Sequence, residues 1–263
     1  MNKLFTNFDT TTKKKWIEKI NIDLNNKVNN LKSNTEGIKI NPIYHADDNF
    51  KTYNCNFPPT WINYQFIDAT NAKKANTKAI EALQNNVAGI CFYKPNNLEI
   101  LLKNIPLKDI RIDFQNYTQK FIKEWGSFSK NKNAKGSFHG NTNINIPNYL
   151  DTIESEGTIK EQIKNALERG LESTKEVQFH FKIGTNFFIE IAKLKAFRIL
   201  WKDKTGKDAF IFTSNYQSSK NEFAYTILKN TTACMSAIFG GANAIMLHPF
   251  HNKFNQDPNF IDR

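Results

Sequence analysis

The sequence predicts an α/β fold, a TIM-type (β/α)8 barrel with an N-terminal helical and extended arm. From residue 61 onward, short runs with alternating apolar residues are separated by longer runs in which apolar residues recur at helical spacing. Strands that alternate with helices predict a parallel sheet, because each parallel pair needs a crossover connection. Eight such strands in about 200 residues fit a closed barrel. An open, doubly wound sheet is the alternative arrangement.

Residues 1–56 differ from the rest of the chain and are expected to form an arm that contacts a partner chain. The three threonines at positions 10–12 cap a predicted helix over residues 13–25. The stretch EGIKINPIY, residues 36–44, is expected to be extended because of its proline. The barrel is assigned to residues 57–263.

Eight segments are predicted to be the strands of the barrel. They are Trp61–Ile67, Ala88–Tyr93, Ile110–Phe114, Gly136–His139, Tyr149–Ile153, Val177–Ile183, Ala209–Thr213 and Ala244–His248. The helical patterns between them are clearest in NAKKANTKAIEAL, TIKEQIKNALERGL, NFFIEIAKLKAFRILW and FAYTILKNTTACMSAIF.

Two of these strands, VQFHFKI and IRIDF, have one apolar and one polar face. Helices cover the outside of such a barrel, so the apolar faces are expected to point outward and the polar faces into the lumen. Buried charged groups are costly unless they are paired. We therefore expect the polar side chains to pair with one another and to plug the lumen. The predicted polar fill is Arg111, Asp113, Gln178, His180 and Lys182.

The composition is that of a globular chain with an excess of positive charge. Of its 263 residues 40% are hydrophobic, and the formal net charge is +11. The lysines are scattered over the predicted helices, and no nucleic-acid-binding motif accompanies them, so we expect no nucleic-acid partner. No apolar run is long enough for a membrane span, and the N-terminus lacks the features of a signal or transit peptide. Cys55, Cys91 and Cys234 have neither disulfide-framework nor metal-ligand spacing, which favours a cytoplasmic location.

Several quoted segments carry a resemblance to a known family. They are LFTNFDTTTKKKWIEKINIDL, WINYQFIDATNAKKANTKAIEALQNNVAGI, TNFFIEIAKLKAFRILW, TSNYQS and ILKNTTACMSAIFGGANAIMLHPF. Together they resemble methylmalonyl-CoA mutase, and most closely the small, non-catalytic chains of that family. Residues 92–158 match poorly, so their strands are predicted from the pattern alone.

The resemblance implies an isomerase that interconverts succinyl-CoA and methylmalonyl-CoA with adenosylcobalamin, the acyl-CoA passing through the barrel. In the family, a separate C-terminal domain supplies the cobalt-ligating histidine in an Asp-x-His-x-x-Gly motif. That motif does not occur in this sequence. We therefore expect the cobalamin-binding domain to be absent and the cofactor to be bound by a partner. The expected partner is a large catalytic mutase subunit, in a heterodimer.

The resemblance also implies that the family's reaction groups are replaced in this chain. The first strand of the family resembles PWTIRQY, whose arginine and tyrosine correspond here to Tyr64 and Phe66. The family's catalytic histidine falls near Thr152, and its substrate-contacting glutamine becomes Phe212. No catalytic residue is therefore predicted, and the chain alone is expected to be inactive.

The positions that keep the family's polar character are candidates for substrate binding. They are Gln65, Lys195, Arg198, Thr213 and Ser214. The simpler expectation for Arg198 is a surface arginine with a packed stem, and for Thr213 and Ser214 a hydrogen-bonded turn. His139 and His180 have no carboxylate or cysteine at metal-ligand spacing, so we expect paired core histidines and no metal site.

The sequence thus predicts a scaffold for a larger catalytic chain. A barrel that binds a small molecule such as an acyl-CoA, without catalysis, is the alternative.

Overall fold

The computed structural model describes residues 11–48, 53, 56–140, 145–216 and 223–248. The chain divides into two compact units, Met1–Asn54 and Cys55–Arg263. Within the described ranges, no helix is both long and apolar enough to cross a bilayer.

The first unit consists of a helix and a small hairpin. Helix α1, Lys13–Asp23, begins after Thr12, whose side chain accepts a hydrogen bond from the Lys15 amide as an N-cap. Two short 3-10 turns, η1 (Val28–Leu31) and η2 (Ala46–Asp48), flank strands β1 (Ser33–Thr35) and β2 (Ile38–Ile40).

The hairpin corrects the expectation of an extended arm over residues 36–44. Strands β1 and β2 pair antiparallel, and the turn between them places Glu36 and Gly37 at positive φ, +50° and +77°. A two-residue hairpin loop favours this conformation, because its twist matches that of the strands. The turn was not predictable, because Glu-Gly is a weaker hairpin signal than Asn-Gly.

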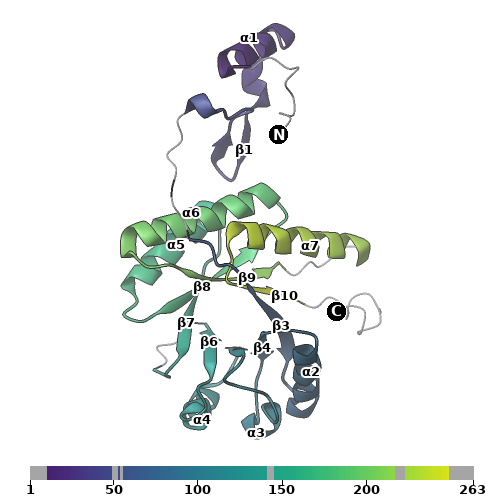
Figure 1. Cartoon of the computed structure of the whole chain (residues 1–263), viewed down its shortest axis with the longest axis vertical. Helices are drawn as coiled ribbons and strands as arrows, with labels where there is room; N and C mark the ends of the chain where they lie inside the picture. Colours follow the sequence, from purple (N-terminus) through teal and green to yellow (C-terminus); the bar gives the residue numbers. More distant parts are fainter. Residues whose placement is uncertain (1–10, 49–52, 54–55, 141–144, 217–222, 249–263) are drawn as a thin grey trace, which may run out of the picture. The chain divides into compact units, whose positions relative to one another are not determined.

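The second unit is a closed barrel of eight parallel strands, as predicted, in the order β10-β3-β4-β5-β6-β7-β8-β9 (Figure 1). The strands are β3 (Ile62–Asp68), β4 (Gly89–Tyr93), β5 (Arg111–Gln115), β6 (Lys135–His139), β7 (Tyr149–Glu154), β8 (Val177–Ile183), β9 (Phe210–Asn215) and β10 (Ala244–Leu247). All eight predicted strands are confirmed, with ends that shift by one or two residues. The open-sheet alternative is excluded, because β10 pairs with both β3 and β9.

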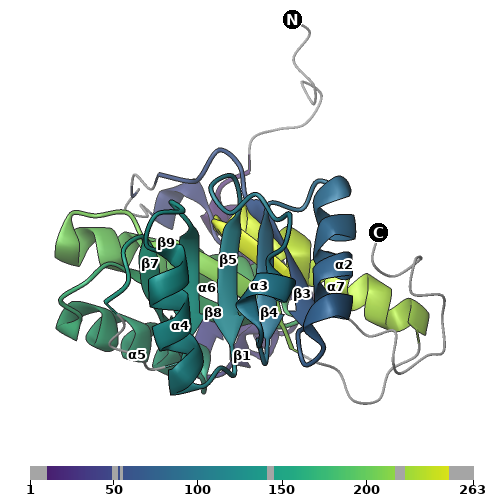
Figure 2. The same cartoon turned by 90° about the horizontal axis from the view of Figure 1, so that it is seen from below.

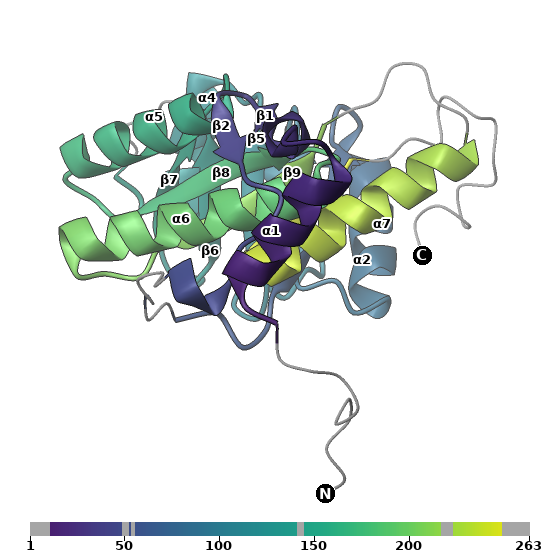
Figure 3. The same cartoon turned by 90° about the horizontal axis from the view of Figure 1, so that it is seen from above.

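Helices cover the outside of this ring of strands (Figures 1 and 2). They are α2 (Ala72–Gln84), α3 (Leu98–Leu101), α4 (Gln119–Ser129), α5 (Ile159–Glu172), α6 (Phe187–Thr205) and α7 (Phe223–Gly240). Figure 3 shows α5, α6 and α7 running side by side, with α6 in contact with both of its neighbours. Helix α7 ends at Gly240, and Gly241 follows at φ +85°, the left-handed conformation that commonly ends a helix.

The main cores lie between the strands and the helices. Around β4, β5 and β6 the buried members include Phe92, Phe114, Phe138, Leu101 and Trp125. Around β8 and β9 they are Phe179, Phe181, Ile211, Leu194, Phe197 and Trp201. The apolar strand faces therefore point outward, as the alternation in β5 and β8 predicted. The polar faces are left for the lumen.

Close contact between β5 and β6 constrains Gly136. A Cβ atom placed there would overlap the carbonyl oxygen of Ile112 on the neighbouring strand, which is backbone and has little freedom to move. Glycine is therefore required by space and not by its φ angle.

We expect Gly136→Ala to destabilise the barrel by about 1–3 kcal/mol or more, because two paired strands must move apart. The matched control is Gly126→Ala in α4, where the new Cβ would meet Ile146 at an ordinary 3.8 Å. That change is expected to be neutral or to stabilise, since alanine favours a helix over glycine. Thermal unfolding followed by circular dichroism measures both, and equal melting temperatures for the two variants would contradict the prediction.

Candidate functional site

The lumen of the barrel is divided into an apolar and a polar side. Tyr64, Cys91, Phe212, Ala244 and Met246 form a buried cluster on β3, β4, β9 and β10. The other side, on β5, β6, β7 and β8, is lined by buried polar and charged groups. They are Asp113, Ser137, His139, Thr152, Gln178 and His180, with Arg111 half-buried below them.

Asp113 is the centre of the polar side and is fully buried. Its carboxylate accepts hydrogen bonds from the Tyr64 hydroxyl (3.0 Å), the Ser137 amide (3.0 Å) and the Ser137 hydroxyl (2.6 Å). Gln178 Nε2 donates to the same carboxylate at 3.2 Å, and His139 Nε2 lies 3.2 Å from it. The buried charge is thus surrounded by donors from β3, β6 and β8, the arrangement that offsets its desolvation.

Arg111 closes the lumen one layer toward the amino ends of the strands. Its Nε donates to the Tyr64 hydroxyl at 3.0 Å, and a terminal nitrogen donates to Gln178 Oε1 at 3.3 Å. The guanidinium also lies 4.5 Å from the centre of the Phe210 ring. Tyr64 therefore links the cation to the carboxylate and joins the two sides of the lumen.

Burial and charge shift the pKa values of these groups. Burial alone raises the pKa of Asp113, but the hydrogen bond with His139 and the positive charge of Arg111 outweigh it and lower that pKa below its ordinary value. Burial, followed by the negative charge of Asp113, raises the pKa of Tyr64. Burial likewise raises the pKa of the Cys91 thiol, so this cysteine is an inert part of the lumen.

A second cluster lies at the carboxyl ends of β6, β7 and β8. His139 Nδ1 is 3.3 Å and His180 Nδ1 is 3.4 Å from the same oxygen, Glu154 Oε1. The nearby ring of His139, and then that of His180, hold the pKa of Glu154 well below its usual range. Burial lowers the pKa of His180, whereas contacts with Asp113 and Glu154 outweigh burial at His139 and raise its pKa.

This cluster corrects one expectation from the sequence. The two histidine rings do lie together, 5.2 Å between centroids and edge to face. The expectation that neither has a carboxylate partner is wrong, since Glu154 lies beside both. Spacing along the chain did not reveal Glu154, because the three residues come from three strands and meet only when the barrel closes.

The residues named from the sequence fall into different places. Tyr64, Thr152, Phe212, Ser214 and Gln178 line the lumen, where Ser214 Oγ lies 2.8 Å from His180 Nε2. Thr213 and Ser214 belong to strand β9, so the expectation of a turn there is wrong. Gln65 lies on the outer face of β3, the face that also carries the core residue Ile67. The Thr213 hydroxyl donates a hydrogen bond to the carbonyl of Ala244 on the neighbouring strand β10.

Phe66 and Lys182 lie near the carboxyl end of the lumen. Lys182 is at the rim and pairs with Glu156 at 2.7 Å with its side chain 35% exposed, so it is not part of the buried fill. The Phe66 ring lies 5.7 Å from that of Tyr93 and 5.0 Å from that of His248.

Arg198 and Lys195 lie on α6, away from the lumen. Arg198 is 3% exposed, which makes the expectation of a surface arginine wrong. Its guanidinium donates to the carbonyls of Gly241 (2.6 and 2.8 Å) and Ala209 (3.1 Å), and to the Asn243 side chain. It therefore ties the amino ends of β9 and β10 to the helix. Lys195 is exposed, with its ammonium 5.3 Å from the centre of the Phe57 ring.

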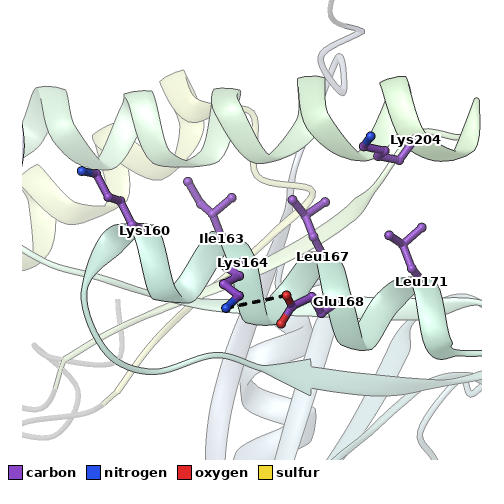
Figure 4. A pocket seen from close by; sticks show the side chains of 7 residues that line it. All are labelled: Lys160, Ile163, Lys164, Leu167, Glu168, Leu171 and Lys204. Atoms are coloured by element: carbon purple, nitrogen blue, oxygen red, sulfur yellow. Dashed lines mark ion pairs between the residues drawn. The ribbon is translucent and has the colours of Figure 1, made fainter.

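Among the described residues, hollows outside the lumen include one at the amino ends of the strands and one on α5. A hollow of about 730 Å³ at the amino ends of the strands is lined by sixteen residues that include the cationic side chains of Arg111, Lys135, Lys175 and Lys207. A shallower groove of about 390 Å³ lies on α5, with Lys204 of α6 on its other side (Figure 4). In Figure 4, Ile163, Leu167 and Leu171 form its apolar floor, and Lys164 pairs with Glu168 at 3.8 Å.

Comparison with known proteins agrees with the resemblance found in the sequence. The family described as methylmalonyl-CoA mutase matches residues 157–259. The methylmalonyl-CoA mutase small subunit of Porphyromonas gingivalis (strain ATCC BAA-308 / W83) is 23% identical over 350 residues, which cover 99% of this chain and 56% of that protein. The chain thus spans little more than half the length of this relative. The predicted resemblance to methylmalonyl-CoA mutase, and to its small subunit, is confirmed.

Similar solved structures are more distant. The dihydropteroate synthase of Thermus thermophilus has a TM-score of 0.49 at 11% identity, and the match covers 72% of this chain and 89% of that one. The Yersinia pestis dihydropteroate synthase has a TM-score of 0.47 at 10% identity, with coverages of 83% and 92%. Similarity at this level supports no functional argument.

The Asp113 network generates a prediction about stability. We expect Asp113→Ala to lower the free energy of unfolding by about 3–5 kcal/mol, because Arg111 loses its nearby countercharge and buried donors lose their acceptor. Tyr64→Phe, which removes one hydroxyl from the same network, is expected to cost about 1 kcal/mol. Urea unfolding measures both changes.

Asp109→Ala is the matched control, because Asp109 is an exposed aspartate just before β5. Its loss is expected to change the free energy of unfolding by less than about 0.5 kcal/mol. If the Asp113 variant were no less stable than this control, the carboxylate would not be the centre of the lumen.

Proposed function

We propose, from its similarity to methylmalonyl-CoA mutase, that this chain is a non-catalytic small subunit that docks on a larger catalytic mutase chain and stabilises it. The observation that carries the proposal is the filled lumen. Hydrogen bonds across the barrel axis join Tyr64, Arg111, Asp113 and Gln178. The resemblance to the mutase family implies that an acyl-CoA would pass along this axis. A partner that binds only the folded form of another chain raises the stability of that chain by mass action.

The carboxyl end of the barrel does not fit a cobalamin ligand. His139 and His180 are 6% and 5% exposed, so neither extends a ring nitrogen from the lumen toward a corrin at the face of the barrel. His248 packs its ring against Phe66, with Nδ1 buried. We therefore assign adenosylcobalamin to the partner chain and derive no reaction step through it here.

Helix α7 supports a docking role. Four large apolar side chains are exposed on this helix, those of Tyr225, Leu228, Met235 and Phe239. Because they are spaced by three, seven and four residues, they lie along one face of the helix. Leu228 is 63% and Phe239 is 55% exposed. An exposed apolar stripe of this length is typical of a protein contact surface. We assign this stripe, together with the unit of residues 1–54, to contact with the catalytic chain.

The proposal predicts a heterodimer. Co-expression with a catalytic methylmalonyl-CoA mutase chain from the same source is expected to give a 1:1 complex in gel filtration, whereas the isolated chain with adenosylcobalamin is expected to show no mutase turnover above a protein-free blank. Elution of the two chains as separate peaks at micromolar concentrations, or turnover by this chain alone, would contradict the assignment.

The α7 stripe can be tested in the same assay. Leu228→Glu combined with Met235→Glu is expected to weaken the complex at least tenfold without changing the circular dichroism of the isolated chain, because two charges are placed in an apolar contact. Leu171→Glu is the matched control, since this leucine of α5 is 51% exposed and lies outside the stripe. Its effect on the complex is expected to be less than about twofold.

One observation favours a second candidate, an acyl-CoA-binding barrel without catalysis. The hollow at the amino ends of the strands has four cationic side chains against two acidic ones, Glu176 and Asp208, and this excess of positive charge suits the phosphates of a coenzyme A. Calorimetry with CoA and succinyl-CoA separates the two candidates, because heat of binding to the isolated chain is expected only for the second.

A further inference from the structure

We propose that His139, Glu154 and His180 form a binding site for a divalent transition metal, of which zinc is the preferred ion. One ligand atom from each residue lies within 4.8 Å of the others. The three residues come from β6, β7 and β8, neighbouring strands of the barrel, and all lie in the carboxyl-terminal half of the lumen. The site therefore rests on the most regular part of the fold, which holds its ligands in place.

The distances suit a metal of this class. The two Nδ1 atoms lie 3.3 and 3.4 Å from Glu154 Oε1. Two ligands that are each about 2.0–2.1 Å from a tetrahedral zinc ion are separated by roughly 3.3 Å. Both histidine–glutamate separations thus match a tetrahedral zinc site, and the ligand atoms of the two imidazoles lie within 4.8 Å of each other.

The outer partners of both histidines favour coordination through Nδ1. His139 Nε2 faces the carboxylate of Asp113 at 3.2 Å, and His180 Nε2 faces the hydroxyl of Ser214 at 2.8 Å. A carboxylate accepts hydrogen bonds, so it holds the hydrogen of His139 on Nε2 and leaves Nδ1 for a metal. Metal-bound histidines are commonly oriented by such a carboxylate, and Asp113 is itself fixed by Ser137 and Tyr64.

An independent observation points to a ligand at this place. His180 is 5% exposed, and its Nδ1 is buried without a hydrogen-bond partner among the described residues, although it faces Glu154. A buried polar atom without a partner is costly, and a metal ion would satisfy it. Gln115 Nε2 lies 3.3 Å from His139 Nδ1, and a metal bound to Nδ1 would replace that contact.

The ligand set indicates which ions are suitable. Two imidazoles and one carboxylate favour zinc and neighbouring first-row metals over magnesium or calcium, which prefer oxygen ligands alone. Three protein ligands leave at least one coordination position for water. The Glu154 side chain is 42% exposed, so this position is reached from the carboxyl face of the barrel.

The test uses the full chain, reduced and freed of metal with a chelator. Calorimetric titration with Zn²⁺ is expected to show that one equivalent binds per chain. When Co²⁺ is added instead, the absorption spectrum is expected to show the visible bands of a tetrahedral ion and to lack the near-ultraviolet band of a cobalt–thiolate bond. Glu154→Gln is expected to weaken Zn²⁺ binding about 100-fold, since it removes a direct ligand.

Glu156→Gln is the matched control, because Glu156 lies two residues further along, is exposed, and pairs with Lys182 outside the site. It is expected to change the affinity less than threefold. His45→Asn, in the first unit, controls for binding by a histidine elsewhere. Circular dichroism checks that each variant keeps the wild-type melting temperature without metal.

The proposal is overturned if the wild-type chain binds less than one equivalent of Zn²⁺, or if Glu154→Gln binds it as tightly as Glu156→Gln does. A thiolate band in the Co²⁺ spectrum would also overturn it, by assigning the metal to a cysteine. None of these measurements involves a partner chain, so the result does not depend on the proposed docking function.

Discussion

The buried carboxylate of Asp113 is the constraint on which the lumen depends. A fully desolvated charge persists only where donors and a cation surround it, and here they come from four different strands. Tyr64 bonds to both Asp113 and Arg111, so the polar side of the lumen is joined to the apolar side through one hydroxyl. Ser137 and Gln178 satisfy each other as well, with Gln178 Nε2 2.9 Å from Ser137 Oγ. The side chains that fill the barrel axis thus form one hydrogen-bonded network, in which each side chain fixes the position of its neighbours.

This network separates the two ends of the barrel. The cationic hollow at the amino ends and the His139–Glu154–His180 cluster at the carboxyl ends lie on opposite sides of the Arg111 and Asp113 layers. Carboxyl ends are where barrels of this type position chemical groups, because the loops there converge on the axis. This chain therefore still places titratable groups at that end although its axis is filled, and its own use for them need not follow that of its relatives.

Much of the barrel was predictable from the sequence, because strand alternation and helical spacing report directly on which face is buried. The polar faces of β5 and β8 even identified Arg111, Asp113 and Gln178 as lumen groups. Contacts between strands were not predictable in the same way. Glu154 ends a strand with little sequence signal, and its two histidine neighbours are 15 and 26 residues away. The burial of Arg198 was not predictable either. The groups that accept its hydrogen bonds, on Ala209, Gly241 and Asn243, are more than ten residues away along the chain.

The division of the lumen into an apolar and a polar side gives the two halves of the barrel different responses to temperature. Apolar burial weakens on cooling, since its driving force near room temperature is entropic. Hydrogen bonds between buried groups do not depend on that force. At low temperature the apolar lumen contacts of β9, β10, β3 and β4 therefore weaken more than the hydrogen bonds around Asp113. Cooling thus shifts the cohesion of the lumen toward the side of Asp113, and the pairs β4 with β5 and β8 with β9 mark the boundary between the two sides.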